Sequence, residues 1–434
     1  MPIAKPVLIT GTLVSALLVF GVQLVAQSSP PTVTVLSIAP GFPYSGVAVG
    51  GDGALYGTTV TGRPYDNGTV YSASPGGAMS VLYRFAGGDD GAAPYAGVAI
   101  TNRHGRPPVL YGTTLSGGSS NNGTVYSLTP SASGGQWRKT VLHSFSGGSD
   151  GAGPYAGVVI GSASDGQPVL YGTTYYGGTS NNGVIYALKP LPEDGGSWTE
   201  SILHAFTGGP GDGANPYAGL ALDSRPDGEI ILYGTTTLGG AFGYGTVFSL
   251  RSSPAGSWAE KPLYSFTGGP DGASPYAGIT IGGGLAGRPV LFGASAYGGY
   301  ATIWHGAIFS LTPAASAGGA WEEATLHTFA GGAPPDGATP YANVVIGPGG
   351  ALYGVTYQGG IGTANGWGTI FSLTPPAGAP SGPWAEQVLY YFNLCGCDEG
   401  EELPRGLASG RDSNGTPVFY GTTQAGGVVF SFTP

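Results

Sequence analysis

Four carboxylates and two thiols lie in one short segment near the end of the chain. They are, in order, Cys395, Cys397, Asp398, Glu399, Glu401 and Glu402. Arg405 stands where other copies have Ala96 or Ala156. Carboxylate oxygens are the ligands that calcium prefers, so this cluster, together with Arg405, could hold a calcium ion or a polar ligand. The alternative is a solvated acidic loop closed by a small Cys395–Cys397 disulfide, a bond that exported proteins retain. The residue types favour the solvated loop, and no other motif indicates a cofactor.

Aromatic residues form a second set of ligand-binding candidates. In three consecutive repeats they replace the Ser-Asn-Asn-Gly of earlier copies, at Phe242, Tyr244, Tyr300, Trp304, His305 and Trp367. Exposed rings at these positions could stack on the apolar faces of sugars, while nearby Asn and Asp bond the hydroxyl groups. Buried rings would instead pack between neighbouring sheets. The sequence leaves both interpretations open.

Five aspartates recur at regular intervals, each followed by Gly-Ala. They are Asp90, Asp150, Asp212, Asp271 and Asp336. A ring of carboxylates could attract cations, but neighbouring copies should lie too far apart to share an ion that needs six to eight oxygens. An aspartate that accepts hydrogen bonds from backbone N–H groups two residues on is common in turns. We therefore expect a structural role, and we expect the repeated Thr pairs to pack within strands.

Residues for catalysis are scarce, and none is assigned such a role. Three of the five histidines, His143, His204 and His327, occupy one repeated position where other copies have tyrosine. They are expected to be interchangeable residues of an amphipathic outer strand. His305, beside Trp304, would need a partner within about 3 Å to act as a base. Paired carboxylates for glycoside cleavage need not be close in sequence, so that chemistry stays open.

The composition limits the folds that could position these residues. The 434 residues include 84 glycines and 36 prolines, which disfavour helix interiors by roughly 1 and 3 kcal/mol each. The 26 Tyr, 16 Phe and 7 Trp provide enough apolar surface for a core. An all-β protein is therefore predicted. A net charge of −10 with only 14 Lys and Arg excludes nucleic acid as an expected partner.

The N-terminus has the pattern of a secretory signal peptide. Lys5 precedes a nearly uncharged stretch from Val7 to Val25, and Ala26 precedes a polar segment with two prolines. We predict a signal peptide over residues 1–26 and a linker over 27–32. An uncleaved anchor helix is the alternative, because 19 apolar residues almost span a bilayer.

The rest of the chain, residues 33–434, is built from seven repeats of about 60 residues. The tetrad YGTT begins at Tyr56, Tyr111, Tyr171, Tyr233 and Tyr420, with looser copies at Phe292 and Tyr353. Each unit has four β-like runs, a to d, which in the third unit span residues 154–160, 169–174, 183–188 and 198–206. Such units predict a seven-bladed β-propeller of four-stranded antiparallel blades, in which the d–a and b–c connections share one face.

The chain ends distinguish a propeller from a solenoid. The last unit has runs a, b and c but no d, whereas residues 33–38 form a spare run d at the N-terminus. Pairing of this spare strand with the run at 428–432 would close a ring with backbone hydrogen bonds. A solenoid has no use for it, so a closed propeller is predicted.

The pattern LYGTT…GG…GTVYSLTP…LHSF…DGA.PYAG resembles the Gloeo/Verruco, or GloVer, tandem repeat of exported bacterial proteins. The resemblance covers Val33 to Pro434. It implies a repeat architecture and an exported location but no activity. A fainter similarity to kelch repeats, in the order Gly117-Gly118, Tyr126 and Trp137, implies the same architecture.

These observations predict a secreted or cell-surface, monomeric protein that acts as a non-catalytic binding or scaffold module for an extracellular glycan or protein. No membrane contact is expected beyond the signal segment. The alternative is an extracellular glycan-active enzyme, a hydrolase or a lyase, that uses carboxylates on the face of the d–a and b–c connections.

Overall fold

The computed structural model describes residues 30–62, 67–103, 106–131, 136–163, 165–191, 196–283, 289–298, 305–314, 319–331, 336–360, 367–376, 384–392, 403–412 and 414–434. The chain divides into residues 1–30 and residues 31–434, and the architecture below is that of the second unit. The predicted signal peptide and the first part of the linker lie outside the described residues. In the part of the chain that is described, no helix has the length and apolarity needed to cross a membrane.

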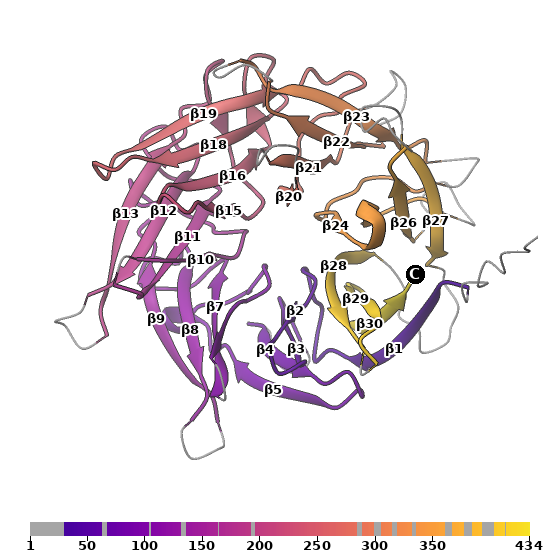
Figure 1. Ribbon diagram of the computed structural model, residues 1–434. Helices are drawn as coiled ribbons and strands as arrows, with labels where there is room; N and C mark the ends of the chain where they lie inside the picture. The colour runs from indigo at the N-terminus through magenta and orange to yellow at the C-terminus, as the bar shows by residue number, and fades with distance from the viewer. Residues whose placement is uncertain are drawn as a thin grey trace, which may run out of the picture. The chain divides into compact units, whose positions relative to one another are not determined.

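Seven four-stranded antiparallel sheets follow one another around a central axis, which confirms the predicted β-propeller (Figure 1). Blade one contains β2 (Ala48–Val49), β3 (Leu55–Thr59), β4 (Thr69–Ala73) and β5 (Met79–Arg84). Blade two contains β6 (Ala99–Arg103), β7 (Arg106–Thr114), β8 (Thr124–Thr129) and β9 (Arg138–Ser144). Blade three contains β10 (Val159–Ser162), β11 (Pro168–Thr174), β12 (Val184–Pro190) and β13 (Trp198–Ala205).

The next three blades repeat this order. Blade four contains β15 (Ala221–Ser224), β16 (Ile230–Thr236), β18 (Thr246–Ser252) and β19 (Trp258–Ser265). Blade five contains β20 (Thr280–Gly282), β21 (Val290–Ser295), β22 (Ala307–Thr312) and β23 (Glu322–Thr328). Blade six contains β24 (Val345–Ile346), β25 (Leu352–Thr356), β26 (Thr369–Thr374) and β27 (Ala385–Tyr391). The innermost strands are shorter than predicted, because the Pro-Tyr segment that leads into each one lies outside the ladder.

Blade seven joins the two ends of the chain. It contains β28 (Pro404–Arg411), β29 (Pro417–Thr423), β30 (Val428–Thr433) and, as its outer strand, β1 (Thr32–Ile38). β1 is antiparallel to β30, with Val33 opposite Phe432 and Ile38 opposite Val428. This pairing confirms the predicted closure. It also gives blade seven the outer strand that the last repeat of the chain lacks, so that β30 is not left as an exposed edge.

The YGTT tetrad explains how each blade packs on the next. A side chain on its glycine would collide with an aromatic ring of the adjacent strand, as at Gly172 and Tyr186. The following threonine bonds a carbonyl of the next blade: the Thr113 hydroxyl donates to Ala156 O (2.8 Å). Thr422 donates in the same way to Ser45 O (2.7 Å), which links blade seven to blade one. The expected packing role of these threonines is therefore accompanied by bonding between blades.

The apolar core is divided among the gaps between neighbouring blades. One cluster of buried residues fills each gap, and aromatic pairs cross it, as where Tyr111 contacts Trp198 edge-on at 6.1 Å. On one face, the d–a connections that enter blades one to six also pair with the b–c connection of the blade they enter. The pairing is a single bridge, such as Ala152 with Tyr176, or the short strands β14 (Gly213–Ala214) and β17 (Leu238–Gly239). This face carries the sites described next.

Candidate functional site

A belt of tyrosines surrounds the axis on the face of the d–a connections. Each of the first six blades contributes the tyrosine of a Pro-Tyr pair: Tyr44, Tyr95, Tyr155, Tyr217, Tyr276 and Tyr341. All six are half-buried, and each contacts the next, with ring centroids 4.8 to 5.3 Å apart. The Tyr217 hydroxyl also donates across the belt to the Tyr95 hydroxyl (2.8 Å).

Arg405 completes this belt in blade seven. Pro404 packs on Gly368 as Pro94 packs on Gly68, so Arg405 follows the turn proline as Tyr95 does. The sequence pattern predicts Arg405 at the position of Ala96. The structure instead places it at the tyrosine position, because blade seven is one residue shorter before β28 resumes its register at Leu407. The only member of the belt that is not a tyrosine is therefore a cation.

The Arg405 guanidinium lies between two aromatic rings. Its Cζ is 4.8 Å from the centroid of Tyr44 and 4.7 Å from that of Tyr357. Nη2 donates to Gln424 Oε1, whereas Nε is shielded from solvent and has no hydrogen-bond partner. Among the described residues, no carboxylate forms an ion pair with Arg405. The rings stabilise its charge in part, and within the described ranges no anion compensates the rest of it.

Two adjoining cavities of about 350 and 330 Å³ open at this axial mouth. Both are lined by Tyr44, Tyr95, Tyr217, Tyr276, Tyr341 and Arg405. Burial raises the pKa of Tyr95, Tyr217, Tyr276 and Tyr341 above the ordinary phenol value. These phenols therefore keep their protons at neutral pH and offer hydroxyl groups and flat apolar faces.

The structure places four of the six aromatic and histidine residues predicted to bind ligand. Phe242 is 59% exposed and Tyr244 is 43% exposed, and the Tyr244 ring lies over Gly268 of the neighbouring connection. His305 lies over Gly331 in the same way. Trp367 is half-buried and packs against the core between blades six and seven, as the packing interpretation expects. Tyr300 and Trp304 lie outside the described residues, so a shared stacking surface remains a prediction.

These residues share a backbone role that their side chains do not reveal. The carbonyls of Asn122, Tyr244 and His305 accept hydrogen bonds from the N–H groups of Gly153, Ser274 and Thr339. The Trp367 carbonyl accepts from Leu403 in the same manner. The position thus anchors each d–a connection to the preceding b–c connection, whichever side chain it carries.

The five repeated aspartates stabilise their own connections. Asp271 accepts hydrogen bonds from the Thr267 N–H (2.7 Å), the Thr267 hydroxyl (2.5 Å) and the Tyr264 hydroxyl (2.9 Å). The expected structural role fits this geometry, but the donors precede the aspartate instead of following it. Asp90, Asp150, Asp212 and Asp336 accept from N–H groups at the matching positions.

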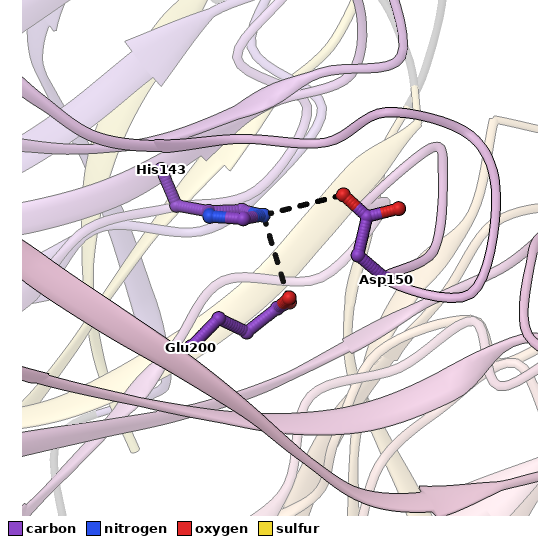
Figure 2. A group of neighbouring side chains, drawn as sticks. All are labelled: His143, Asp150 and Glu200. Atoms are coloured by element: carbon purple, nitrogen blue, oxygen red, sulfur yellow. Dashed lines mark ion pairs between the residues drawn. The ribbon is translucent and has the colours of Figure 1, made fainter.

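Each aspartate also meets residues from two successive blades at the outer part of a junction. Strand d of the first blade supplies tyrosine or histidine, and strand d of the next supplies lysine or glutamate. At the second junction, His143 Nε2 is 3.6 Å from both Asp150 Oδ2 and Glu200 Oε1 (Figure 2). At the third, His204 Nε2 is 3.2 Å from Asp212 Oδ1, with Glu260 beside them.

Burial governs the charges in these two groups. It raises the pKa of Glu200 to about 8, with Asp150 adding to the effect, and that of Glu260 to about 7. Burial also lowers the pKa of His143 and outweighs the attraction of Asp150. It opposes ionisation of Asp212 too, but hydrogen bonds from His204 and Thr207 outweigh it and lower the pKa of that carboxyl.

The acidic cluster remains a prediction. Cys395, Cys397, Asp398, Glu399, Glu401 and Glu402 lie outside the described residues, and Arg405 alone of the residues near that cluster is placed by the structure.

The profile of the Gloeobacter/Verrucomicrobia repeat matches residues 19–228 and, in a second overlapping match, residues 191–434. The chain belongs to the Gloeobacter/Verrucomicrobia repeat family. The resemblance inferred from the YGTT and PYAG motifs is thereby confirmed. No curated protein matches this Gloeobacter/Verrucomicrobia repeat protein.

This Gloeobacter/Verrucomicrobia repeat protein is similar, at low identity, to several solved structures. The N-terminal domain of Nup159 is 11% identical, with 94% of this chain and 96% of that chain covered and a TM-score of 0.46. The polysaccharide lyase Uly1 is 12% identical, with 91% and 90% covered and a TM-score of 0.46. An α-L-arabinanase of Penicillium chrysogenum, solved with arabinobiose, is 13% identical, with 93% and 97% covered and a TM-score of 0.43. Similarity at this level carries no argument about activity.

Sequence reasoning missed both the tyrosine belt and the junction groups of this repeat protein. The signal for the belt was the Pro-Tyr pair before each inner strand. The signal for the junctions was the joint recurrence of His or Tyr, the Asp of Asp-Gly-Ala, and the residue two places after each strand-d tryptophan, as in Trp198 and Glu200. Each motif was visible alone, but their meeting depends on the contact between blades.

Proposed function

We propose that this protein is a binding module whose axial mouth takes an acidic saccharide. In this proposal a carboxylate of the saccharide pairs with Arg405, and the sugar ring lies against the tyrosine belt. The observation that carries the proposal is the half-buried guanidinium of Arg405, which has a buried unpartnered Nε and no anionic partner among the described residues. Its planar donors suit a carboxylate, which can accept two parallel hydrogen bonds.

The shape and the lining of the mouth support a sugar as the ligand. A cavity of about 350 Å³ is within the usual range for small-ligand sites. Tyrosine provides a flat apolar face together with a hydroxyl group that can bond sugar hydroxyls. Because the belt tyrosines already contact one another, their rings are held in place before any ligand arrives, which reduces the entropy lost on binding.

The same lining favours binding over glycan cleavage. Among the described residues that line the two cavities, none is Asp, Glu or His. The belt tyrosines are protonated at neutral pH for the reason given above, so they are poor general bases. An enzyme at this mouth would have to draw its acid or base from elsewhere in the chain.

Affinity electrophoresis tests the proposal directly. The native chain is run in gels containing polygalacturonate and in gels containing neutral dextran, and it should be retarded only by the acidic polymer. Arg405→Gln should raise the dissociation constant for polygalacturonate, obtained from the retardation, at least tenfold. Arg411→Gln is a matched control, because Arg411 is an exposed arginine at the other end of β28. Retardation should also weaken at high salt, since salt screens charge pairs.

The outcomes separate the alternatives. Equal retardation of Arg405→Gln and the native chain, or none with any acidic polysaccharide tried, contradicts the proposal. Release of unsaturated or reducing ends from the polymer would replace the binding function with a catalytic one.

A further inference from the structure

One imidazole and two carboxylates meet at three junctions between blades, and at two of them the donor atoms come close together. The first group is His143, Asp150 and Glu200, and the second is His204, Asp212 and Glu260. In each group, one donor atom from every residue lies within 4.8 Å of the other two. Among the described residues, only these two groups meet that condition. This proposal does not depend on the axial mouth.

The spacing at His143 matches that of ligands around a single metal ion. Nε2 lies 3.6 Å from an oxygen of Asp150 and 3.6 Å from an oxygen of Glu200, as Figure 2 shows. These separations are longer than a hydrogen bond. Zinc bonds of 2.0 to 2.2 Å at tetrahedral angles place neighbouring ligand atoms about 3.4 Å apart.

Two of the three donor atoms have no other partner. His143 Nε2 and Glu200 Oε1 are shielded from solvent and accept or donate no hydrogen bond. Buried polar atoms are satisfied in the great majority of cases, so two orphans that face each other and an aspartate require an explanation. At the second group, Glu260 Oε1 is buried and unpartnered in the same way.

The surrounding residues hold the ligands in place. Asp150 accepts from the Ser146 N–H (2.7 Å) and the Ser146 hydroxyl (2.5 Å), and the His143 ring packs edge-on against Phe145 at 4.8 Å. At the second group, the carboxylate of Asp212 is bonded by Thr207 and the ring of His204 packs on Phe206. Contacts of this kind orient metal ligands.

The first junction has a cation of the chain at the corresponding position. There Lys139 replaces the glutamate and Tyr83 replaces the histidine. The Lys139 ammonium bonds Asp90 Oδ1 at 2.9 Å, with only 3% of its side chain exposed. At this junction a positive charge carried by the chain itself therefore neutralises the aspartate. The junction of Tyr264, Asp271 and Glu323 also lacks an imidazole, and no ion pair to Asp271 is found there among the described residues.

We propose that the His143 and His204 groups each bind one divalent transition-metal ion, with zinc as the natural probe, through one imidazole nitrogen and two carboxylate oxygens. Imidazole ligands suit zinc and its neighbours, whereas calcium and magnesium prefer oxygen ligands alone. The ion would connect the outer strands of successive blades, and water would complete its coordination.

Calorimetric titration with zinc chloride tests the proposal. The untagged full chain is freed of metal with EDTA, dialysed and titrated. His143→Gln and His204→Gln should each remove one equivalent of bound zinc, and the double variant should remove two. Tyr264→Phe, at a junction without histidine, should remove none. Other zinc-binding residues in the chain do not alter these differences.

A second variant and a second readout guard against misfolding. Glu200→Gln has nearly the same shape as the native residue and should weaken zinc at that site at least tenfold. Cobalt should give visible absorption bands in the native chain that shrink by about half with either His143→Gln or Glu200→Gln. Zinc should also raise the melting temperature of the native chain, because it binds the folded state. An equivalent count that neither histidine substitution changes, or the absence of saturable binding, overturns the proposal.

Discussion

At the axial mouth, six blades contribute a tyrosine and the seventh contributes Arg405, whose charge finds no anion among the described residues. At the junctions between blades, every described aspartate of the Asp-Gly-Ala loops is bonded by N–H and hydroxyl or imidazole groups of its own blade. Both regions repeat with the same period and lie on the same face of the blades. They differ in whether the repeated aspartates, on one side, and Arg405, on the other, find hydrogen-bond or charge partners among the described residues.

This difference indicates separate roles for the two regions. A buried carboxylate that accepts several hydrogen bonds stabilises the fold, because removal leaves its donors without partners. A guanidinium held between rings with a free donor contributes less to stability and can bond an incoming anion. We therefore expect junction substitutions to affect unfolding and mouth substitutions to affect binding.

The largest effect is expected from Asp271→Ala at the junction between blades four and five. The substitution leaves the Thr267 N–H and two hydroxyl donors unpaired in a site where Asp271 is 7% exposed. The free energy of unfolding should fall by about 3 kcal/mol. Urea denaturation followed by tryptophan fluorescence measures it.

Asp227→Ala is the control for this loss. Asp227 is an exposed residue of blade four that accepts a single bond, from the Glu229 N–H at 3.0 Å. Its substitution should lower the free energy of unfolding by no more than about 1 kcal/mol. Equal losses for the two variants would mean that the junction aspartates do not stabilise the fold in the manner described.

The sequence predicts a feature of these regions best where short stretches of neighbouring residues determine it. The blades and their closure followed from short-range patterns: alternating strands, turn glycines, and a spare strand at residues 33–38 that pairs with β30. The position of Arg405 was assigned one residue away, because the shortening before Leu407 is visible only when Pro404 is seen in its turn.

The junction groups lay further from what the sequence can reveal. His143 and Glu200 come from different blades, and their separation depends on the packing angle between two sheets. The sequence identified the histidines as residues interchangeable with tyrosine, which they are by position. It could not supply the carboxylates that face them, since no rule of spacing along one strand connects the two.

An intermediate effect on the free energy of unfolding is expected from pH at the junction of Asp271, between blades four and five, to which Glu323 also belongs. Burial raises the pKa of Glu323 above its usual value of 4.5 and outweighs the hydrogen bond from Thr325. Between 4.5 and the raised value, the native state holds a proton that the unfolded state has released. The free energy of unfolding should therefore fall as pH rises through this interval.

Glu323→Gln should make that pH dependence less steep, because the amide does not titrate. Part of the slope should remain, since the pKa values of Glu200 and Glu260 are also raised. Glu322→Gln, which changes the exposed neighbour on the same strand, should leave the slope as in the native chain. Urea midpoints measured from pH 4 upward, in steps of about half a unit, provide the comparison. A slope in Glu323→Gln as steep as that of the native chain would show that this carboxyl is not the source.

The smallest effect is expected within the tyrosine belt, from Tyr95→Phe and Tyr217→Phe. Either substitution removes the hydroxyl bond of 2.8 Å between the two rings but leaves the ring contacts, such as that of Tyr217 with Tyr276 at 4.8 Å. Each should cost about 1 kcal/mol or less, and the double variant should cost little more than one single variant, because the second substitution removes a hydroxyl that has already lost its partner. A double-mutant cycle of unfolding free energies measures this coupling.

Strict additivity of the two losses would mean that each hydroxyl has its own hydrogen-bond partner. The belt would then stabilise the fold through independent bonds, as the junctions do. Small, non-additive losses of unfolding free energy would instead mean that contacts between the ring faces hold the belt together. The two hydroxyl groups could then give up their mutual hydrogen bond and bond a sugar at little cost in stability.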